Sequence, residues 1–137
     1  MAATLKLEIV TPEEKIYSED VEMVTLPGSE GELGVYPNHV PVLTALKPGE
    51  LRIVKGGKQS AMAIGEGFVE IKADRISILT EMALQSEQID LEAAEKAVAS
   101  AQAAMKEDHT AEEVAAIQGS LQKALAQMHV KRRHHHG

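Results

Sequence analysis

Apolar residues change their spacing once along this chain, and that change constrains the fold more than any other feature. In the first part apolar and polar side chains alternate in short runs, as in Leu5, Leu7 and Ile9, and turn residues separate the runs. In the second part apolar residues recur every three or four positions. Alternation indicates strands with one buried face, whereas the longer spacing indicates amphipathic helices. The sequence therefore predicts an α+β chain divided into residues 1–86 and 87–137.

Several short alternating runs between residues 4 and 85 are typical of an antiparallel β-sandwich or flattened barrel. Gly56-Gly57 predicts a hairpin turn between two of the strands, and Ala73-Asp74 predicts a weaker one. Hydrophobic residues make up 44% of the chain but aromatic residues only 2%, so the core is expected to be aliphatic.

The second part predicts two helices joined by a few residues, which form an antiparallel hairpin. Asp90 is the expected N-cap of the first helix, and Thr110 with Glu113 forms a capping box for the second. The first helix places apolar residues at Leu91, Ala94, Val98, Ala101 and Met105. The second helix places them at Val114, Ile117, Leu121, Leu125 and Met128.

The apolar surface of the second helix is thin. Five large side chains contribute about 1.5–3 kcal/mol each when fully buried. Ordering the backbone costs about 1–2 kcal/mol per residue before hydrogen bonds and packing offset it. Gly119, in the middle of the helix, costs about 1 kcal/mol more than alanine. We therefore expect a hairpin that docks weakly and is able to move.

Charge is distributed unevenly. The net charge of −7 argues against a general nucleic-acid-binding protein, which requires a basic surface. Acidic residues dominate from Asp90 to Glu113, and no acidic residue follows. The basic residues that follow are Lys123, Lys131, Arg132 and Arg133. They either complement the helix dipole or dock on an acidic surface.

No residue pattern predicts catalysis. The chain has no cysteine, and no serine lies in a nucleophile motif. Gly28, Gly31 and Gly34 do not form a phosphate loop, because a β-like run and a turn follow them instead of a helix. We expect these glycines to have positive φ angles or close backbone approaches. His39 has no second metal-ligating histidine at a matching spacing, so a structural or contact role is expected.

Neither a metal site nor a membrane span is predicted. His134 to His136 could bind a metal, but a frayed terminus explains them more simply. No apolar run reaches the roughly 18 residues that suggest a bilayer span, and the N-terminus has no signal-peptide pattern. Direct insertion into a membrane is therefore not expected.

Three segments carry a family resemblance: GELGVYPNHVPVLTALKPG, GEGFVEIKADRISILTEMA and IDLEAAEKA. Together with the order of sandwich and hairpin, they resemble the epsilon subunit of bacterial F-type ATP synthases over essentially the whole chain. The resemblance implies a non-catalytic subunit of the central stalk, peripheral on the cytoplasmic face of the bacterial inner membrane. Such a subunit contacts the gamma subunit and the ring of c subunits, and helps to transmit proton-driven rotation.

The resemblance also implies residue roles. Glu32 corresponds to the contact with the c ring, and Thr11, His39 and Thr44 correspond to contacts with gamma. In this family the hairpin permits ATP hydrolysis when folded and inhibits it when extended toward the catalytic alpha and beta subunits. The candidates for that inhibitory contact are Lys123, Lys131, Arg132 and Arg133.

One family motif is incomplete. Some members bind ATP through Ile or Leu, Asp, two variable residues, Arg and Ala. Here Ile89 and Asp90 match, but Ala93 replaces the arginine. This departure puts ATP binding in doubt, and no cofactor is predicted. The alternative function is a stand-alone β-sandwich module that binds a peptide or a sugar and has no affinity for gamma.

Overall fold

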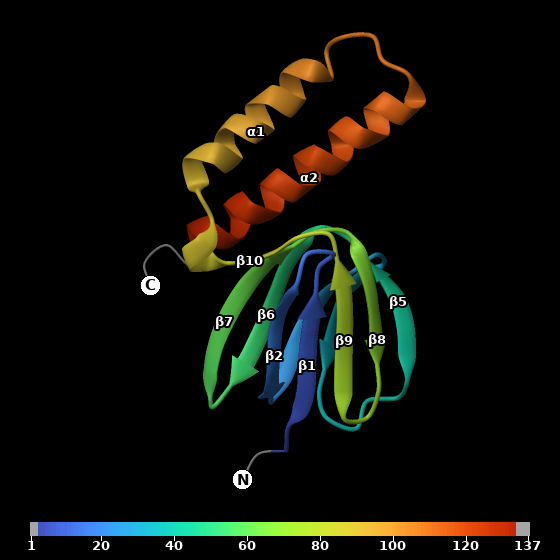
Figure 1. The fold of residues 1–137 in the computed structure, drawn as a ribbon, viewed down its shortest axis with the longest axis vertical. Helices are drawn as coiled ribbons and strands as arrows, with labels where there is room; N and C mark the ends of the chain where they lie inside the picture. The colour runs from blue at the N-terminus through green and yellow to red at the C-terminus, as the bar shows by residue number, and fades with distance from the viewer. Residues whose placement is uncertain (1–2, 134–137) are drawn as a thin grey trace.

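The computed structural model describes residues 3–133. Figure 1 shows a flattened β-barrel with an antiparallel hairpin of two helices at one end. The predicted α+β fold, a sandwich followed by a helical hairpin, is confirmed. The strands are β1 (Leu5–Val10), β2 (Lys15–Val21), β3 (Met23–Gly28), β4 (Gly31–Val35), β5 (Val42–Leu46), β6 (Gly49–Lys55), β7 (Lys58–Ile64), β8 (Gly67–Ile71), β9 (Arg75–Thr80) and β10 (Ala83–Gln85). The helices are the 3-10 helix η1 (Ser86–Gln88), α1 (Leu91–Ala104) and α2 (Ala111–Arg133).

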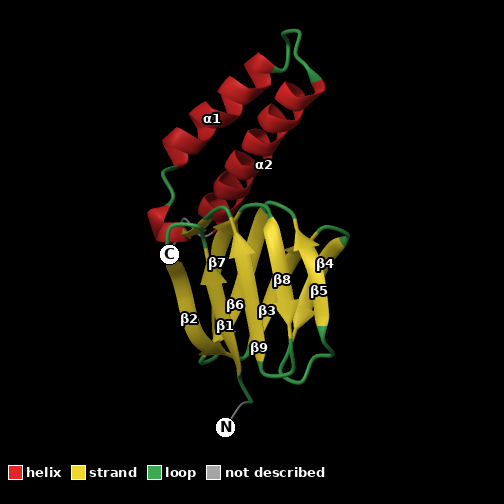
Figure 2. Cartoon of the chain, turned by 45° about the vertical axis from the view of Figure 1, so that its right-hand side comes forward, coloured by secondary structure: helices red, strands yellow, loops and turns green. Residues whose placement is uncertain are grey.

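The strands form one sheet that folds over itself into two layers (Figure 2). Their order is β10-β7-β6-β3-β5-β8-β9-β1-β2, and β4 pairs with β3. All pairs among the described residues are antiparallel except β1 with β9. That parallel pair is a feature of the barrel that the alternation of the strands does not predict. Its partners are far apart in sequence, and parallel pairing requires a long crossover of this kind.

Alternation along the strands builds the core. In β1, Leu5, Leu7 and Ile9 are buried, whereas the residues between them are partly exposed. The barrel interior is aliphatic, as expected, with Tyr17 the only aromatic side chain packed against it among the described residues. β7 departs from the pattern, because its last four residues are all buried. Met62 and Ile64 face the core, while alternate residues pack under the hairpin.

The predicted turns are present. Gly56 and Gly57 connect β6 to β7 with φ angles of 59° and 75°. Both residues therefore have left-handed backbone, which the two-residue hairpin turn requires. Ala73 and Asp74 lie between β8 and β9 in a turn in which Lys72 N donates to Arg75 O at 2.8 Å.

The predicted helix starts are also confirmed. Asp90 is the N-cap of α1, and its Oδ1 accepts from Ala93 N at 3.1 Å. Before α2, Thr110 N donates to Glu113 Oε1 at 2.8 Å, and Glu113 N donates to Thr110 Oγ1 at 3.2 Å. This reciprocal pair is a capping box.

The hairpin touches the barrel through the C-terminal part of α2. α1 packs along α2, and α2 rests on β6, β7 and η1 (Figure 1). Val130 is fully buried in a small cluster with Ala61, Ala63 and Ile89.

The stripe of five large residues predicted for α2 is not the buried side of that helix. All five side chains keep some exposure, and Leu125 is 38% exposed. The buried residues are Ala124, Ala126 and Val130 instead. Small side chains allow α2 to approach its neighbours closely, which apolar periodicity alone does not reveal.

Candidate functional site: an exposed apolar sheet face and a charged hairpin contact

Three large apolar side chains lie in solvent on the outer face of neighbouring strands. Leu43 in β5 is 74% exposed, Phe68 in β8 is 63% exposed and Leu79 in β9 is 62% exposed. Phe68 is directly opposite Leu79 across β8 and β9, and opposite Ala45 across β8 and β5. Large apolar side chains grouped on the exposed face of a small protein favour a contact with another protein or a ligand. We call Leu43, Phe68 and Leu79 the apolar row.

The apolar row is not among the features predicted from the sequence. Each member sits at the position in its strand where the alternation expects a polar side chain. Val69 and Ile78, the neighbours of Phe68 and Leu79, face the core. Successive side chains of a strand point to opposite faces, so an apolar residue at a position that faces solvent is the signal that could have revealed the apolar row.

Thr11 lies beside one member of the apolar row, whereas His39 lies in the segment that precedes β5. Thr11 follows β1 and lines a shallow hollow together with Leu79. Its hydroxyl donates to Glu14 O at 3.2 Å. His39 precedes β5, and its Nδ1 lies 2.7 Å from Val40 O.

Thr44, the third predicted contact with gamma, points differently. It alternates with Leu43 in β5 and so lies on the same side of the strand as Leu46, which is in the core. Thr44 is half-buried. The structure therefore brings Leu43, not Thr44, to the exposed face.

The glycine-rich segment forms the β3–β4 hairpin. Gly31 has a φ of 131°, and a Cβ on Gly28 would lie 2.7 Å from Gly31 O. These two glycines confirm the expected positive φ and close approach. At Gly34 φ is not positive, and an added Cβ would meet only the end of Met23, at 3.4 Å. Glu32 follows in β4 and is exposed.

All four basic candidates on α2 have partners within the chain. Lys123 Nζ is 3.8 Å from Glu81 Oε1, and Lys131 Nζ donates to Ser86 O at 2.9 Å. The two lysines therefore pair with an acidic side chain and with a backbone carbonyl, both outside α2.

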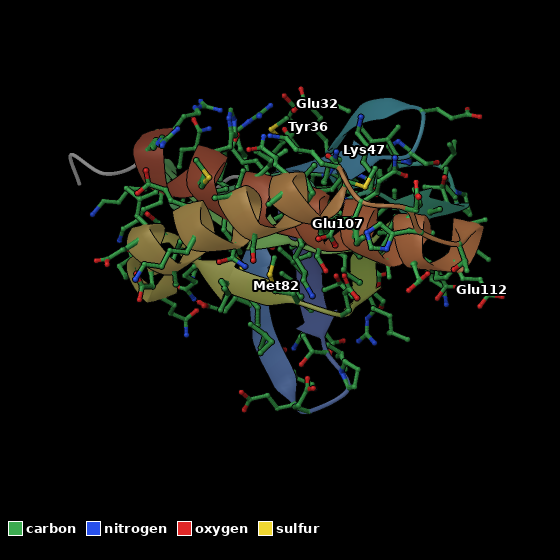
Figure 3. All side chains as sticks on the ribbon, turned by 90° about the horizontal axis from the view of Figure 1, so that it is seen from above. Glu32, Tyr36, Lys47, Met82, Glu107 and Glu112 are labelled. Carbon is green, nitrogen blue, oxygen red and sulfur yellow. The ribbon has the colours of Figure 1, made fainter. Side chains whose placement is uncertain are left out.

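A further polar contact lies between the two lysines. Gln127 Nε2 of α2 is 3.0 Å from the sulfur of Met82, which lies beside the hairpin in Figure 3.

The last two basic residues make ion pairs. Arg132 Nη2 contacts Glu95 Oε2 of α1 at 3.2 Å. Arg133 Nη1 contacts Glu50 Oε1 of β6 at 2.5 Å. In this conformation, the acidic surface on which the basic residues dock belongs to the chain itself.

Arg52 extends this contact across the sheet. Its Nη1 lies 3.0 Å from both Glu32 Oε2 and Glu50 Oε1, and its Nη2 donates to Glu32 Oε1 at 3.3 Å. These hydrogen bonds, first with Glu32 and then with Glu50, raise the pKa of the Arg52 guanidinium above its ordinary value. Arg52 is therefore a fixed positive charge between two carboxylates.

The start of α1 shows how the incomplete ATP motif is used. Ile89 is buried in the cluster with Val130, and the Asp90 carboxylate accepts from Ala93 N. No arginine lies in α1. Ile89 and Asp90 therefore have structural roles in this conformation, one in packing and one in capping.

Metal-binding and membrane features are absent from the described part of the chain. No group of three or more histidine and acidic side chains is arranged to hold a metal ion within residues 3–133. His134 to His136 lie outside the described residues. None of the described helices is both long and apolar enough to cross a bilayer.

Comparison with known proteins identifies the family. Residues 4–86 match the family described as the beta-sandwich domain of the ATP synthase delta/epsilon chain. The ATP synthase epsilon chain of Desulforamulus reducens is 41% identical, with 91% of this chain and 95% of the relative covered. That of Dehalococcoides mccartyi strain BAV1 is 38% identical, with 97% of each covered.

A solved structure agrees with these relatives. A chain in the cryo-EM structure of the Euglena gracilis mitochondrial ATP synthase (OSCP/F1/c-ring) superposes with a TM-score of 0.80 and 28% identity. The match covers 92% of this chain and 80% of the Euglena chain. The fold, the matched family and the full-length relatives agree, and this chain belongs to the ATP synthase epsilon-chain family.

Proposed function

We propose that this chain is a non-catalytic rotor subunit of a proton-translocating F-type ATP synthase, peripheral on the cytoplasmic face of the bacterial inner membrane. In this proposal residues 1–86 bind the rotor and residues 87–137 form a regulatory hairpin. The family membership supports the assignment to the complex, and the exposed apolar row carries the proposed rotor contact.

The gamma subunit is the proposed partner of the apolar row. Leu43, Phe68 and Leu79 offer three large side chains on one rigid sheet face, and burying each contributes about 1.5–3 kcal/mol. Thr11, which shares a hollow with Leu79, and His39, which precedes β5, are the proposed polar contacts with gamma. Thr44 is half-buried, so its proposed effect on gamma binding is indirect, through the position of Leu43 in the same strand. A sheet face held by regular hydrogen bonds suits a permanent torque-bearing contact better than a loop does.

Glu32 is the proposed contact with the c ring. It is an exposed carboxylate on the β3–β4 hairpin, and a polar loop of a partner can approach it there. The ion pair with Arg52 orients its side chain without burying it. The proposal requires no membrane-spanning segment in this subunit.

The hairpin is proposed to inhibit ATP hydrolysis when it extends toward the catalytic alpha and beta subunits. Lys123, Lys131, Arg132 and Arg133 contact the chain's own acidic or carbonyl groups in the folded hairpin. Release would make them available to acidic segments of the catalytic subunits. Lys123 and Arg132 are in exposed pairs, which are worth only about 0–1 kcal/mol each, so exchange of partners costs little.

Binding to the gamma subunit of the same organism tests the proposal. Changing Phe68 and Leu79 together to serine should weaken gamma binding by at least tenfold, measured by calorimetry. Leu125→Ser removes an exposed leucine from α2 and is the matched control, with binding expected to remain unchanged. No gamma binding by the unaltered chain would instead favour the stand-alone module for a peptide or a sugar.

A further inference from the structure

Four charged side chains form a continuous series of contacts from the end of the helical hairpin to strand β4. Arg133 of α2 contacts Glu50 of β6, which contacts Arg52 of the same strand, which contacts Glu32 of β4. The three links are 2.5, 3.0 and 3.0 Å long. We call this set the charge chain, and it spans three neighbouring strands, β6, β3 and β4.

Glu50 is the central member. Its side chain is only 4% exposed, and its Oε1 accepts hydrogen bonds from both Arg52 Nη1 and Arg133 Nη1. His129 Nε2 is 4.0 Å from the same oxygen. A buried carboxylate depends strongly on its cationic partners. The two guanidinium groups therefore share one buried negative charge.

The charge chain lies next to the apolar contact between α2 and the barrel. Glu50 is directly opposite Ala63 in the β6–β7 ladder, and Arg52 is opposite Ala61. Both alanines pack in the cluster that contains Val130 of α2. A change in the Arg133 ion pair therefore acts where α2 meets the barrel.

Arg52 divides its interaction between two acids. Because Nη1 is equally close to Glu32 and Glu50, loss of the Glu32 charge leaves the guanidinium to neutralise Glu50 more completely. The attraction between Arg133 and Glu50 is then weaker, because Glu50 is already largely neutralised by Arg52. Loss of Arg52 has the opposite effect, since Glu50 then depends more on Arg133.

We propose that the charge chain makes release of the hairpin sensitive to what binds Glu32. A cationic or hydrogen-bonding group of a partner that neutralises Glu32 frees Arg52 for Glu50 and loosens Arg133. The hairpin opens more often as a result. The use of this coupling in the complex rests on the proposed function, but the coupling itself is a property of the isolated chain.

Thiol labelling of Ala63→Cys measures opening, because the chain has no native cysteine and Ala63 is fully buried beneath α2. The labelling rate reports even rare openings of the hairpin. In this background Glu32→Gln should raise the rate by about two- to fivefold, the range expected from one ion pair. Arg52→Met should lower the rate by a similar factor.

Arg133→Met supplies the decisive background. The effects of Glu32→Gln and Arg52→Met should both become much smaller once Arg133 is absent, because its ion pair is the shortest contact between α2 and Glu50. Arg75→Met removes an arginine that pairs with Glu8 outside the charge chain, and it should leave the Glu32→Gln effect intact. The same measurements on Ala61→Cys provide a second probe if the first variant folds poorly.

Two results would overturn the coupling. One is a change of the same sign for Glu32→Gln and Arg52→Met, which indicates general loosening of the barrel. The other is an effect of Glu32→Gln that is equally large with and without Arg133. Neither result depends on gamma or the c ring, so failure of the coupling is distinct from failure of the proposed function.

Discussion

Arg133 Nη1 lies 2.5 Å from Glu50 Oε1, and this contact joins the last described residue of α2 to a buried carboxylate in the barrel. Around it, Val130 packs on Ala61 and Ala63. The hairpin is therefore held to the barrel at one end, by one small apolar cluster and a few polar contacts. This arrangement fits a part that can detach while the barrel stays folded.

The basic residues at the end of α2 have two proposed roles, inhibiting hydrolysis and holding the hairpin closed. We predict that Lys131→Ala, Arg132→Ala and Arg133→Ala together weaken the inhibition of hydrolysis, most clearly at low salt, where charge contacts are least screened. The same variant should open the hairpin more often, because its closed-state partners are also lost. Lys106→Ala, outside this cluster, is the control in hydrolysis assays over a range of salt concentrations. Unchanged inhibition would limit these residues to holding the closed hairpin.

The capping box of α2 predicts a dependence on pH. A hydrogen bond from the Thr110 backbone, and then one with its side chain, holds the pKa of Glu113 below its ordinary value. A lowered pKa in the folded state stabilises the helix above the unfolded pKa, and this stabilisation is lost as pH falls through the folded pKa. Helicity measured by circular dichroism should therefore fall at acidic pH. Glu113→Gln should remove part of that dependence, and an unchanged acid transition would count against the capping role.

Two glycines give opposite predictions for substitution by alanine. A Cβ on Gly67 would overlap the carbonyl oxygen of Leu79, so Gly67→Ala should destabilise the barrel by several kcal/mol, in the range of severe backbone and packing defects. A Cβ on Gly119 meets nothing within 4 Å, so Gly119→Ala should stabilise α2 by about 1 kcal/mol. Thermal unfolding of the two variants checks both signs. Equal stability of the two variants would show that the barrel can shift at Gly67.

Nucleotide binding is predicted to be absent or weak. Ala93 takes the place of an arginine, and the Asp90 carboxylate already caps α1. Calorimetry with Mg-ATP should show no tight binding. A micromolar site would show that another cation, such as Arg132 beside Glu95, substitutes for the missing arginine.

The sequence predicts the fold well because local signals and burial agree. The alternation of Leu5, Leu7 and Ile9, the turn at Gly56-Gly57 and the helix starts are all present. Each depends on neighbouring residues only. The parallel pairing of β1 with β9 depends on long-range topology, and no local pattern encodes it.

The candidate surfaces are less predictable. Glu50 looks like an ordinary exposed strand residue in the sequence, but in the structure it is buried and contacts Arg133 of α2. The buried side of α2 is built from alanines, which carry a weak periodic signal. Phe68 and Leu79 are visible as misplaced apolar residues only once the inward face of each strand is known.

Hydrolysis by the reconstituted catalytic complex tests the central claim most directly, with the full chain compared with residues 1–88. Both chains should bind gamma, because the apolar row lies in the barrel and remains intact. The full chain should inhibit hydrolysis, and the truncated chain should not. Equal inhibition by the two chains, or loss of gamma binding on truncation, would contradict the assignment of a rotor-binding barrel and a regulatory hairpin.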